Sequence, residues 1–325
     1  MSGKFRITPD RYQRITGAAV LFLSLIIVTG AAVRLTGSGL GCSDWPTCEE
    51  DQLVAEISDL HAMVEFVNRV ITGVVSLAVI IAVLGSLFRD PRRKDLTWWS
   101  LGLVGGVILQ ILVGALVVRE HLPPSLVIAH FLISMVLVWN AVELNHRAKF
   151  PNAKYPIPKR STLRSLISLL VVLASVVLVT GTLVTGSGPH SGAETEQTKD
   201  IFQNLAVDSA SFGNQEVEVK RLPFDVPDVA RVHAIAVIIF LVVLTYLLLR
   251  IRRSNKNRHV LLYAQNLLTV TVLQGALGYT QYFTDVPALL VGFHIAGAVA
   301  VWIMTLRLHL AVRLPTVTTT GEVRA

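Results

Sequence analysis

Charged residues are scarce in this chain of 325 residues. Asp, Glu, Lys and Arg together make up 16 % of the sequence, whereas soluble domains contain about 25 %. Hydrophobic residues make up 52 %, so the chain has too few charges to cover a water-facing surface of this size. The composition excludes an ordinary soluble domain and predicts a protein that crosses the lipid bilayer several times.

Cysteine is rare as well, and the charge that is present is mainly positive. The two cysteines are Cys42 and Cys48, which excludes a fold built on a disulfide framework. The formal net charge is +7, but the basic residues lie in short clusters between long apolar runs. This distribution predicts no basic binding face, so we expect the lipid bilayer, and not nucleic acid, as the surroundings of the chain.

Eight apolar stretches are long enough to cross a membrane as helices. About 20 apolar residues span about 30 Å of hydrocarbon. The first stretch is too long for the apolar region of a signal peptide and has no convincing cleavage site. We therefore predict an all-α polytopic membrane protein with transmembrane helices near 15–33, 64–88, 97–118, 125–144, 166–186, 229–249, 260–283 and 288–310.

Lys and Arg gather in the connections on one side of this predicted bundle. Of the 29, 22 lie in the N-terminal tail, in alternate connections or at the C-terminal end. Positively charged loops stay on the cytoplasmic side of a membrane. Both termini are therefore predicted to be cytoplasmic, and the two long loops 34–60 and 189–228 are predicted to face outward.

Short motifs recur in the same order in the two halves of the chain. The segment 28–39 recurs as 179–188 with two residues missing, and 64–70 aligns with 229–235 at an offset of 165. Two later pairs are Gly114-Ala-Leu116 with Gly275-Ala-Leu277, and His130 with His294. Because each half has an even number of helices, an axis along the membrane normal would relate the halves. The repeat predicts two pseudo-symmetric four-helix bundles.

Three of the nine histidines lie inside predicted spans. His130, His233 and His294 lie about five to seven residues from the outer ends of their helices, which is about 7–10 Å below the outer boundary. Polar side chains at such a depth are costly and mark functional sites. His233 and His294 lie at matching depth in the second bundle, and imidazole is an axial ligand of haem iron. The pair predicts a bound haem, with two histidines hydrogen-bonded across helices as the alternative.

The first bundle differs at the corresponding place. His130 is present, but Asn68 stands where the alignment has His233, and Asn is a poor iron ligand. Glu65 lies one turn outward on the same face of the helix, and Arg69 follows Asn68. A carboxyl group in this place suits proton transfer. We therefore expect a catalytic site in the first bundle and a fixed cofactor in the second.

Together these residues resemble the haem A synthase family over all eight spans. The resemblance rests on Thr36-Gly-Ser-Gly39 and the following loop 41–48 with its two cysteines, on Glu65-Phe-Val-Asn-Arg69, on Ala129-His-Phe131, and on the histidines of the second bundle. Members of this family convert haem O to haem A for cytochrome oxidase. The resemblance implies a plasma-membrane enzyme of a bacterium that oxidises a ring methyl of haem O, through an alcohol and a gem-diol, to a formyl group.

The resemblance also implies a role for each site residue. His233 and His294 become the axial ligands of a haem B, His130 the ligand of the substrate haem, and Glu65 the catalytic carboxylate. Cys42 and Cys48 resemble a loop pair that forms a disulfide on the oxidising side of the membrane. The implied partners are the prenyl-transferring haem O synthase and an electron donor.

The implied organisation places the substrate haem in the first bundle and haem B in the second. The predicted units are a cytoplasmic tail 1–14, the first bundle 15–147, a linker 148–163, the second bundle 164–313 and a tail 314–325.

Two departures from the family pattern stand out. Many members have histidine where this chain has Asn68, within Glu-x-x-His-Arg. The substrate iron is then five-coordinate through His130, or His61, about 10 Å further outward, takes part. We favour an open or water-filled position near Asn68. The second outer loop contains no cysteine, so it is not stapled as it is in some relatives.

Two other functions explain part of the pattern. A di-haem cytochrome that passes electrons from quinol accounts for the histidines, but it leaves Glu65 and Asn68 without a purpose. A transporter accounts for the repeat, but no pair of interrupted spans supports it.

Overall fold

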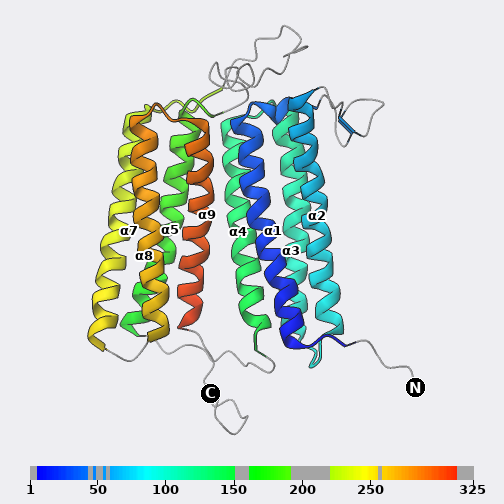
Figure 1. The fold of residues 1–325 in the computed structure, drawn as a ribbon, viewed down its shortest axis with the longest axis vertical. Helices are drawn as coiled ribbons and strands as arrows, with labels where there is room; N and C mark the ends of the chain where they lie inside the picture. The colour runs from blue at the N-terminus through cyan, green and yellow to red at the C-terminus, as the bar shows by residue number, and fades with distance from the viewer. Residues whose placement is uncertain are drawn as a thin grey trace.

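The computed structural model describes residues 6–42, 47–48, 54–55, 59–150, 161–191, 220–254 and 258–312. Most of these residues form long helices, which confirms the predicted all-α class (Figure 1). A 3-10 turn, η1 (Ser38–Leu40), follows the first helix. The long helices are α1 (Pro9–Leu35), α2 (Leu60–Phe88), α3 (Lys94–Arg119), α4 (Pro124–Ala148), α5 (Thr162–Ser187), α7 (Val226–Ser254), α8 (Arg258–Phe283) and α9 (Ala288–Ala311).

All eight long helices are apolar and long enough to cross a membrane, which confirms the predicted spans. Several of them extend beyond the predicted apolar stretch. α1 starts at Pro9, where the Thr8 side chain accepts a hydrogen bond from Arg11 N at 3.4 Å. Proline favours the first turn of a helix and a Thr cap satisfies a free N–H. Polar residues therefore add a turn that hydropathy alone does not mark.

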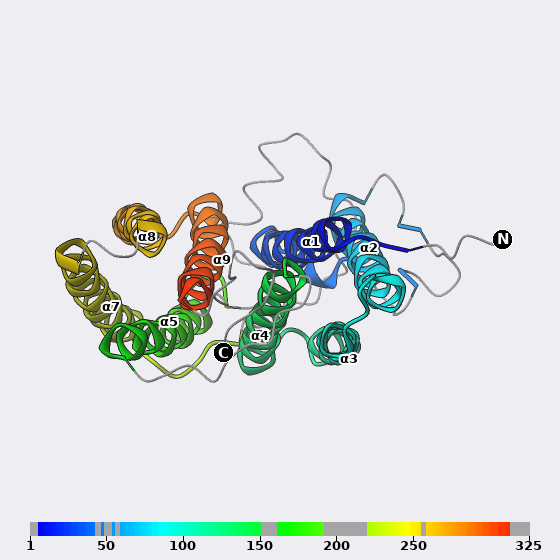
Figure 2. The ribbon, with the colours of Figure 1, turned by 90° about the horizontal axis from the view of Figure 1, so that it is seen from below.

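The helices stand side by side in two groups of four (Figures 1 and 2). In the first group α1 contacts α2, α2 contacts α3, α3 contacts α4, and α4 contacts α1. In the second group α5, α7, α8 and α9 contact one another in the same cyclic order. Two such rings of four agree with the repeat in the sequence, while their pseudo-symmetry and the domain limits stay predictions. Most of the second long loop, 192–219, and most of the linker, 151–160, lie outside the described residues.

The two rings meet along α9. This helix packs against α1 and α4, and α4 also contacts α5. The indole Nε1 of Trp302 in α9 donates to the Met135 carbonyl of α4 at 2.9 Å, and Trp302 is buried. A buried indole N–H needs such a partner, so this bond fixes the two rings against each other.

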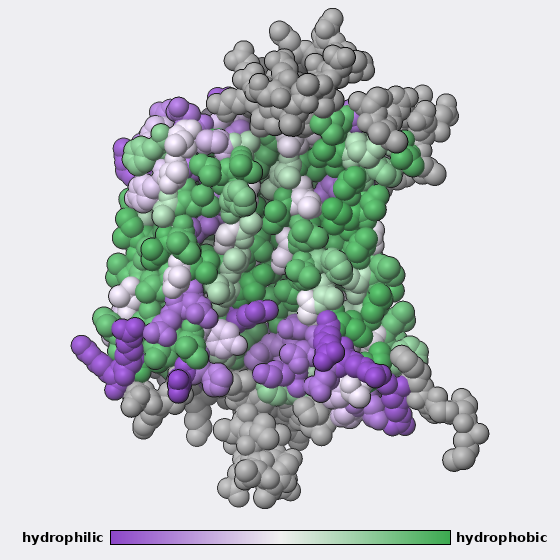
Figure 3. Space-filling model, viewed as in Figure 1, coloured by the Kyte–Doolittle hydropathy of each residue, from purple (hydrophilic) through white to green (hydrophobic). Residues whose placement is uncertain are grey.

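The face of the molecule seen in Figure 3 has a broad apolar band across its middle. Large apolar side chains from several spans, such as Leu21, Leu112 and Leu273, are exposed. Hydrophilic residues gather at the end where α1 begins and α9 ends (Figure 3). A band of this kind faces lipid in a membrane protein. We conclude that the chain is a multi-pass membrane protein, and which end faces the cytoplasm stays a prediction.

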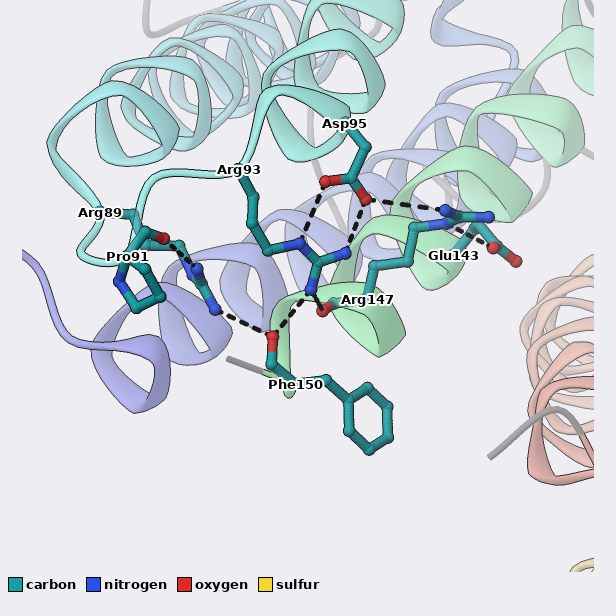
Figure 4. Close-up of polar contacts among 7 residues, drawn as sticks. All are labelled: Arg89, Pro91, Arg93, Asp95, Glu143, Arg147 and Phe150. Carbon is teal, nitrogen blue, oxygen red and sulfur yellow. Dashed lines mark hydrogen bonds and ion pairs between the residues drawn. The ribbon is translucent and has the colours of Figure 1, made fainter. Parts of the chain in front are cut away.

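A polar cluster at this hydrophilic end ties the connection between α2 and α3 to the end of α4 (Figure 4). Arg89 Nη2 and Arg93 Nη1 donate to the Phe150 carbonyl at 3.0 and 2.7 Å. Arg93 also pairs with Asp95, and Arg147 pairs with Glu143, each at 2.6 Å. The arginines form ion pairs and hydrogen bonds with acidic side chains and backbone carbonyls here. The cluster therefore fixes the hydrophilic end of the first ring.

Candidate functional site

The second ring encloses a cavity of about 260 Å³. His233, the eighth residue of α7, and His294, the seventh residue of α9, both line it. The two imidazole ring centres lie 6.5 Å apart. The structure therefore brings together the two histidines that the sequence pairs.

Thr180 of α5 sets the orientation of His233. Its hydroxyl lies 2.9 Å from the Val176 carbonyl and 3.1 Å from His233 Nδ1. Because the hydroxyl has a single proton and donates it to a backbone carbonyl, it accepts from Nδ1–H. The Nε2 atom then keeps its lone pair, which is the form of histidine that binds a metal.

The space around the two rings fits a haem. An iron between the two histidines would form two bonds to nitrogen of about 2 Å each. The rest of the 6.5 Å between the ring centres matches the distance from each bonding nitrogen to the centre of its own ring. A methyl group on Gly181 would lie 3.1 Å from His233 Cε1, and one on Gly278 would lie 3.0 Å from His294 Cε1. Because both positions are glycine, the imidazole rings of His233 and His294 can lie where they would bind an iron between them.

The first ring encloses a larger cavity of about 560 Å³, bounded by α1 to α4 and by parts of α5 and α9. His130, the seventh residue of α4, and Asn68, the ninth residue of α2, both line it. The Thr29 hydroxyl donates to Asn68 Oδ1 at 2.9 Å, as Thr180 contacts His233 in the second ring. Asn68 therefore takes the position of a histidine but offers an amide to the cavity.

Two glutamines hold the helices that carry the histidines. Gln110 Nε2 of α3 donates to the His130 carbonyl at 3.0 Å, and Gln274 Nε2 of α8 donates to the His294 carbonyl at 2.6 Å. Neither glutamine was predicted as a site residue. Each lies twenty residues before its histidine, and this shared spacing is the signal that was available in the sequence.

These contacts also correct one register of the repeat. The sequence comparison pairs Gly114 with Gly275. In the structure a methyl group on Gly114 would lie 3.4 Å from His130 Cε1 and one on Gly278 would lie 3.0 Å from His294 Cε1, whereas one on Gly275 would meet nothing within 4 Å. The matching Gly-Ala-Leu triplets lie three residues out of step with the contacts, because small residues recur along packed membrane helices.

Glu65 lies at the outer end of the first cavity and is 5 % exposed. Its Oε1 accepts from Arg69 Nη2 at 2.5 Å and its Oε2 accepts from Cys42 N at 3.0 Å. Arg69 Nη1 donates to the Thr47 carbonyl at 2.6 Å. The carboxylate therefore joins α2 to the cysteine loop and still lines the cavity.

The cysteine loop is closed by a disulfide between Cys42 and Cys48, with their Cα atoms 4.5 Å apart, as the resemblance implies. Gly41 brings this loop against the start of α2, where an added Cβ would lie 2.5 Å from the backbone of His61. Only glycine permits so close an approach. The disulfide therefore lies directly over the Glu65–Arg69 pair.

His61 and Arg34 lie at the outer end of the first ring. His61 Nδ1 lies 3.1 Å from the Ser38 hydroxyl of η1, and His61 is not among the residues that line the first cavity in the described part of the chain. The structure thus does not bring it to His130. Arg34 does line that cavity, in a place suited to an anionic group of a ligand.

His190 lies in the predicted outer loop 189–228 and has no predicted site role. It is 4 % exposed, lines the second cavity, and its Nε2 lies 2.8 Å from the Val286 carbonyl. Burial holds the pKa of His190 below its usual range, and the nearby Arg34 lowers it further. His190 closes the outer end of the second cavity as a neutral side chain.

The sequence has recognised relatives. It matches the COX15-CtaA family, described as cytochrome oxidase assembly protein, over residues 13–63 and 51–306. It is 26 % identical over 272 residues to a heme A synthase of Listeria monocytogenes, which covers 82 % of this chain and 84 % of the relative. It is 28 % identical over 187 residues to a heme A synthase of Exiguobacterium sibiricum, and this match spans 60 % of that relative's length.

A third match, to a heme A synthase of Lysinibacillus sphaericus, is 30 % identical over 120 residues and spans 39 % of the relative. The family match covers both rings of helices and every histidine that lines the two cavities. On this match, the chain belongs to the COX15-CtaA family.

Proposed function

We propose that the protein is a haem A synthase, which oxidises a ring methyl of haem O to the formyl group of haem A. One observation carries this proposal. Two cavities are lined by histidines, and among the described residues only the larger cavity has a buried carboxylate, Glu65, in its wall. This asymmetry separates a substrate site from a cofactor site, and the names of the relatives support the same reaction.

The second cavity is the proposed site of haem B, with His233 and His294 as axial ligands. A haem bound there supplies one-electron transfer. The chain contributes the fixed Nε2 of His233, the room beside Gly181 and Gly278, and the apolar wall that excludes water. Each of these features holds a ligand in place and leaves it no free position for exchange.

The first cavity is the proposed site of haem O, with His130 as its ligand. Asn68 leaves the opposite face of the substrate without a nitrogen ligand, because an amide binds iron poorly. Arg34 and Arg69 lie at the outer end of the cavity, where guanidinium groups pair with propionates. This orientation directs the propionates outward and the rest of the substrate toward the middle of the membrane.

Glu65 is the proposed proton acceptor. With water as the source of oxygen, each two-electron oxidation step releases two protons and two electrons: the methyl group becomes an alcohol, the alcohol a gem-diol, and the gem-diol loses water to leave the formyl group. Arg69 and Cys42 N fix both carboxylate oxygens at the cavity wall, and a fixed carboxylate suits proton transfer. The oxidant that takes up these electrons is a partner outside this chain.

The two cavities share part of their walls, which supports electron transfer between the sites. Val177, Leu178, Thr185 and Ala298 line both. Electrons released by the substrate would cross this shared wall to reach a haem held by His233 and His294, which would supply one-electron transfer. We place both sites near the outer face of a bacterial plasma membrane, with both termini in the cytoplasm and haem O synthase as the supplier of the substrate.

The proposal is tested by pigment extraction from cells that supply haem O. Glu65→Gln is expected to lower haem A by about 100-fold or more, the usual effect of losing a general base, with haem B retained. Glu143→Gln is the matched control, because Glu143 is a second buried carboxylate with an arginine four residues on. It should leave haem A per protein at the parental level.

The same extraction separates this function from the alternatives. Haem A at the parental level in Glu65→Gln contradicts the role of Glu65. A parent protein that yields haem B alone in every preparation indicates a di-haem cytochrome, and one without any haem indicates a transporter.

A further inference from the structure

The two cavities differ along one face of the equivalent helix in each ring, α2 in the first and α7 in the second. Asn68 of α2 and His233 of α7 are held by the same kind of threonine contact, so they mark equivalent levels. Five residues further along each helix come Gly73 and Ile238, which line the first and the second cavity respectively. Glycine therefore stands in the larger cavity where isoleucine fills the smaller one.

The neighbours of Gly73 follow the same trend. Thr72 and Ser76 line the first cavity at the positions where Val237 and Leu241 line the second. The volumes of the two cavities, about 560 and 260 Å³, differ in the direction that these smaller side chains predict. We call the surface of Thr72, Gly73 and Ser76 the tail groove.

The tail groove is open and behaves as an apolar surface. A Cβ on Gly73 would meet nothing within 4 Å. The Thr72 hydroxyl donates to the Asn68 carbonyl at 3.1 Å, and the Ser76 hydroxyl donates to the Thr72 carbonyl at 2.9 Å. Because both hydroxyls form hydrogen bonds within α2, a ligand in the groove does not need to supply a polar group.

The groove lies deeper in the membrane than the proposed iron ligand. Gly73 is five residues beyond Asn68, or about 7.5 Å further along the helix. The surrounding wall is apolar and comes from α1, α2, α3 and α4, with Leu23, Ile27, Val75, Val107 and Leu137. A polar substituent would lose its hydrogen bonds to water there, whereas a hydrocarbon chain would lose nothing.

We propose that the tail groove binds the prenyl tail of the substrate haem and makes the first cavity selective for a haem that carries such a tail. This inference rests on the proposed function, since it takes haem O as the ligand of the first cavity. The bulkier Ile238 and Leu241 line the corresponding place in the second cavity and leave less room there, which suits a haem without a tail. Gly73 is thus a specificity-determining residue.

The test compares haem O with haem B as ligands of the full-length purified protein. Binding to the first cavity is the part of the titration that His130→Ala removes. Gly73→Ile places the side chain of the second cavity in the groove and displaces about two methylene groups of the tail. It should weaken haem O binding about 10-fold or more and leave haem B binding unchanged. Gly73→Ala should give a smaller loss in the same direction.

Gly105→Ile is the matched control. Gly105 is also an exposed membrane-helix glycine whose added Cβ meets nothing within 4 Å, and it does not line the first cavity in the described part of the chain. This variant should bind both haems as the parent does. The absorption of the haem between His233 and His294 reports whether each variant is folded.

Two results overturn the inference: parental haem O affinity in Gly73→Ile, or equal losses of haem O and haem B. Equal losses would place the macrocycle, and not the tail, in the groove. Failure of the proposed function has a different signature, in which the parent shows no haem O binding that depends on His130, or binds it and forms no haem A.

Discussion

At the scale of single residues, a threonine hydroxyl holds the equivalent side chain in each cavity, but that side chain differs between the two. Thr29 bonds to Asn68, and Thr180 bonds to His233. Asn68, where many family members have histidine, therefore changes the side chain that faces the cavity but keeps the threonine contact that holds it. Because Thr29 occupies Oδ1, the amide nitrogen is the remaining polar atom that Asn68 offers to the cavity.

This arrangement predicts the effect of Asn68→His. The new imidazole would lie beside Thr29, at the level of His233, the proposed ligand in the other ring. With haem O bound in the first cavity, we expect the iron to change from five-coordinate, or water-bound, to ligation by two histidines. The change from high spin to low spin is measured by electron paramagnetic resonance and by the absorption bands of the ferric protein.

Thr29→Val added to Asn68→His should weaken this ligation, since loss of an outer-shell partner typically costs about 10- to 100-fold in metal affinity. A parent protein whose first-cavity haem is already low spin with two nitrogen ligands would contradict the open position near Asn68.

The sequence predicts some of these residues and not others, for a physical reason. His130, His233 and His294 are titratable groups within apolar runs. Because placing such a group inside the membrane costs free energy, the sequence alone marks them as candidate site residues. Thr29, Thr180, Gln110 and Gln274 carry no charge, and only packing decides whether a Thr or Gln in a membrane helix bonds to its own backbone or to a neighbour.

His61 and His190 illustrate the same limit. Both lie just outside or at the end of an apolar run, where the sequence cannot distinguish a buried side chain from a solvated one. The structure buries His190 in the wall of the second cavity and turns His61 toward η1.

At the scale of helices, the eight spans were predictable because a membrane helix requires about 20 apolar residues. The ends of these helices were less predictable from the sequence. α7 continues to Ser254, past the predicted end at 249, with Arg252 and Arg253 in its last turn. Positive side chains stabilise a helix C-terminus, so the helix continues after the apolar pattern has ended.

The polar cluster of Figure 4 gives a prediction at this scale. Arg93→Met removes donors to the carbonyls of Arg147 and Phe150, each of which keeps one other donor, and the closer of the two arginine partners of Asp95. Each intramolecular hydrogen bond that is lost contributes about 0.5–1.5 kcal/mol. We expect a lower midpoint of thermal unfolding for the first ring, measured in detergent by loss of haem O binding, while the second-ring haem is retained.

Arg6→Met is the control for this experiment. Arg6 pairs with Asp90, but the two side chains are 64 % and 50 % exposed, and exposed ion pairs contribute about 0–1 kcal/mol. Equal stability losses in Arg93→Met and Arg6→Met would show that the cluster does not fix the end of the first ring.

At the scale of the whole molecule, the two rings share one wall and meet at their outer ends. Arg34 of the first ring lines the first cavity, and His190, which follows α5, lines the second. Arg34 lies near enough to lower the pKa of His190. A charge on His190 would therefore face both an apolar cavity and the guanidinium group of the other ring.

This position makes the second cavity sensitive to acid. Burial, and to a smaller extent Arg34, hold the pKa of His190 below its usual value although the hydrogen bond to the Val286 carbonyl raises it, whereas the unfolded chain titrates near about 6.5. Above that pH both states are neutral and the free energy of unfolding does not depend on His190. As the pH falls below about 6.5, the unfolded chain takes up a proton more readily than the folded protein, so stability falls.

We therefore expect the parent protein in detergent to lose thermal stability and second-cavity haem between about pH 7 and pH 5. His190→Gln should reduce this loss, because the amide keeps an N–H for the Val286 carbonyl and takes up no proton. His259→Gln is the control, since His259 is exposed at the start of α8, and it should retain the parental pH dependence. If His190→Gln loses haem with the same pH dependence as the parent, the acid sensitivity arises elsewhere, and the contact between the outer ends of the rings does not control the second cavity.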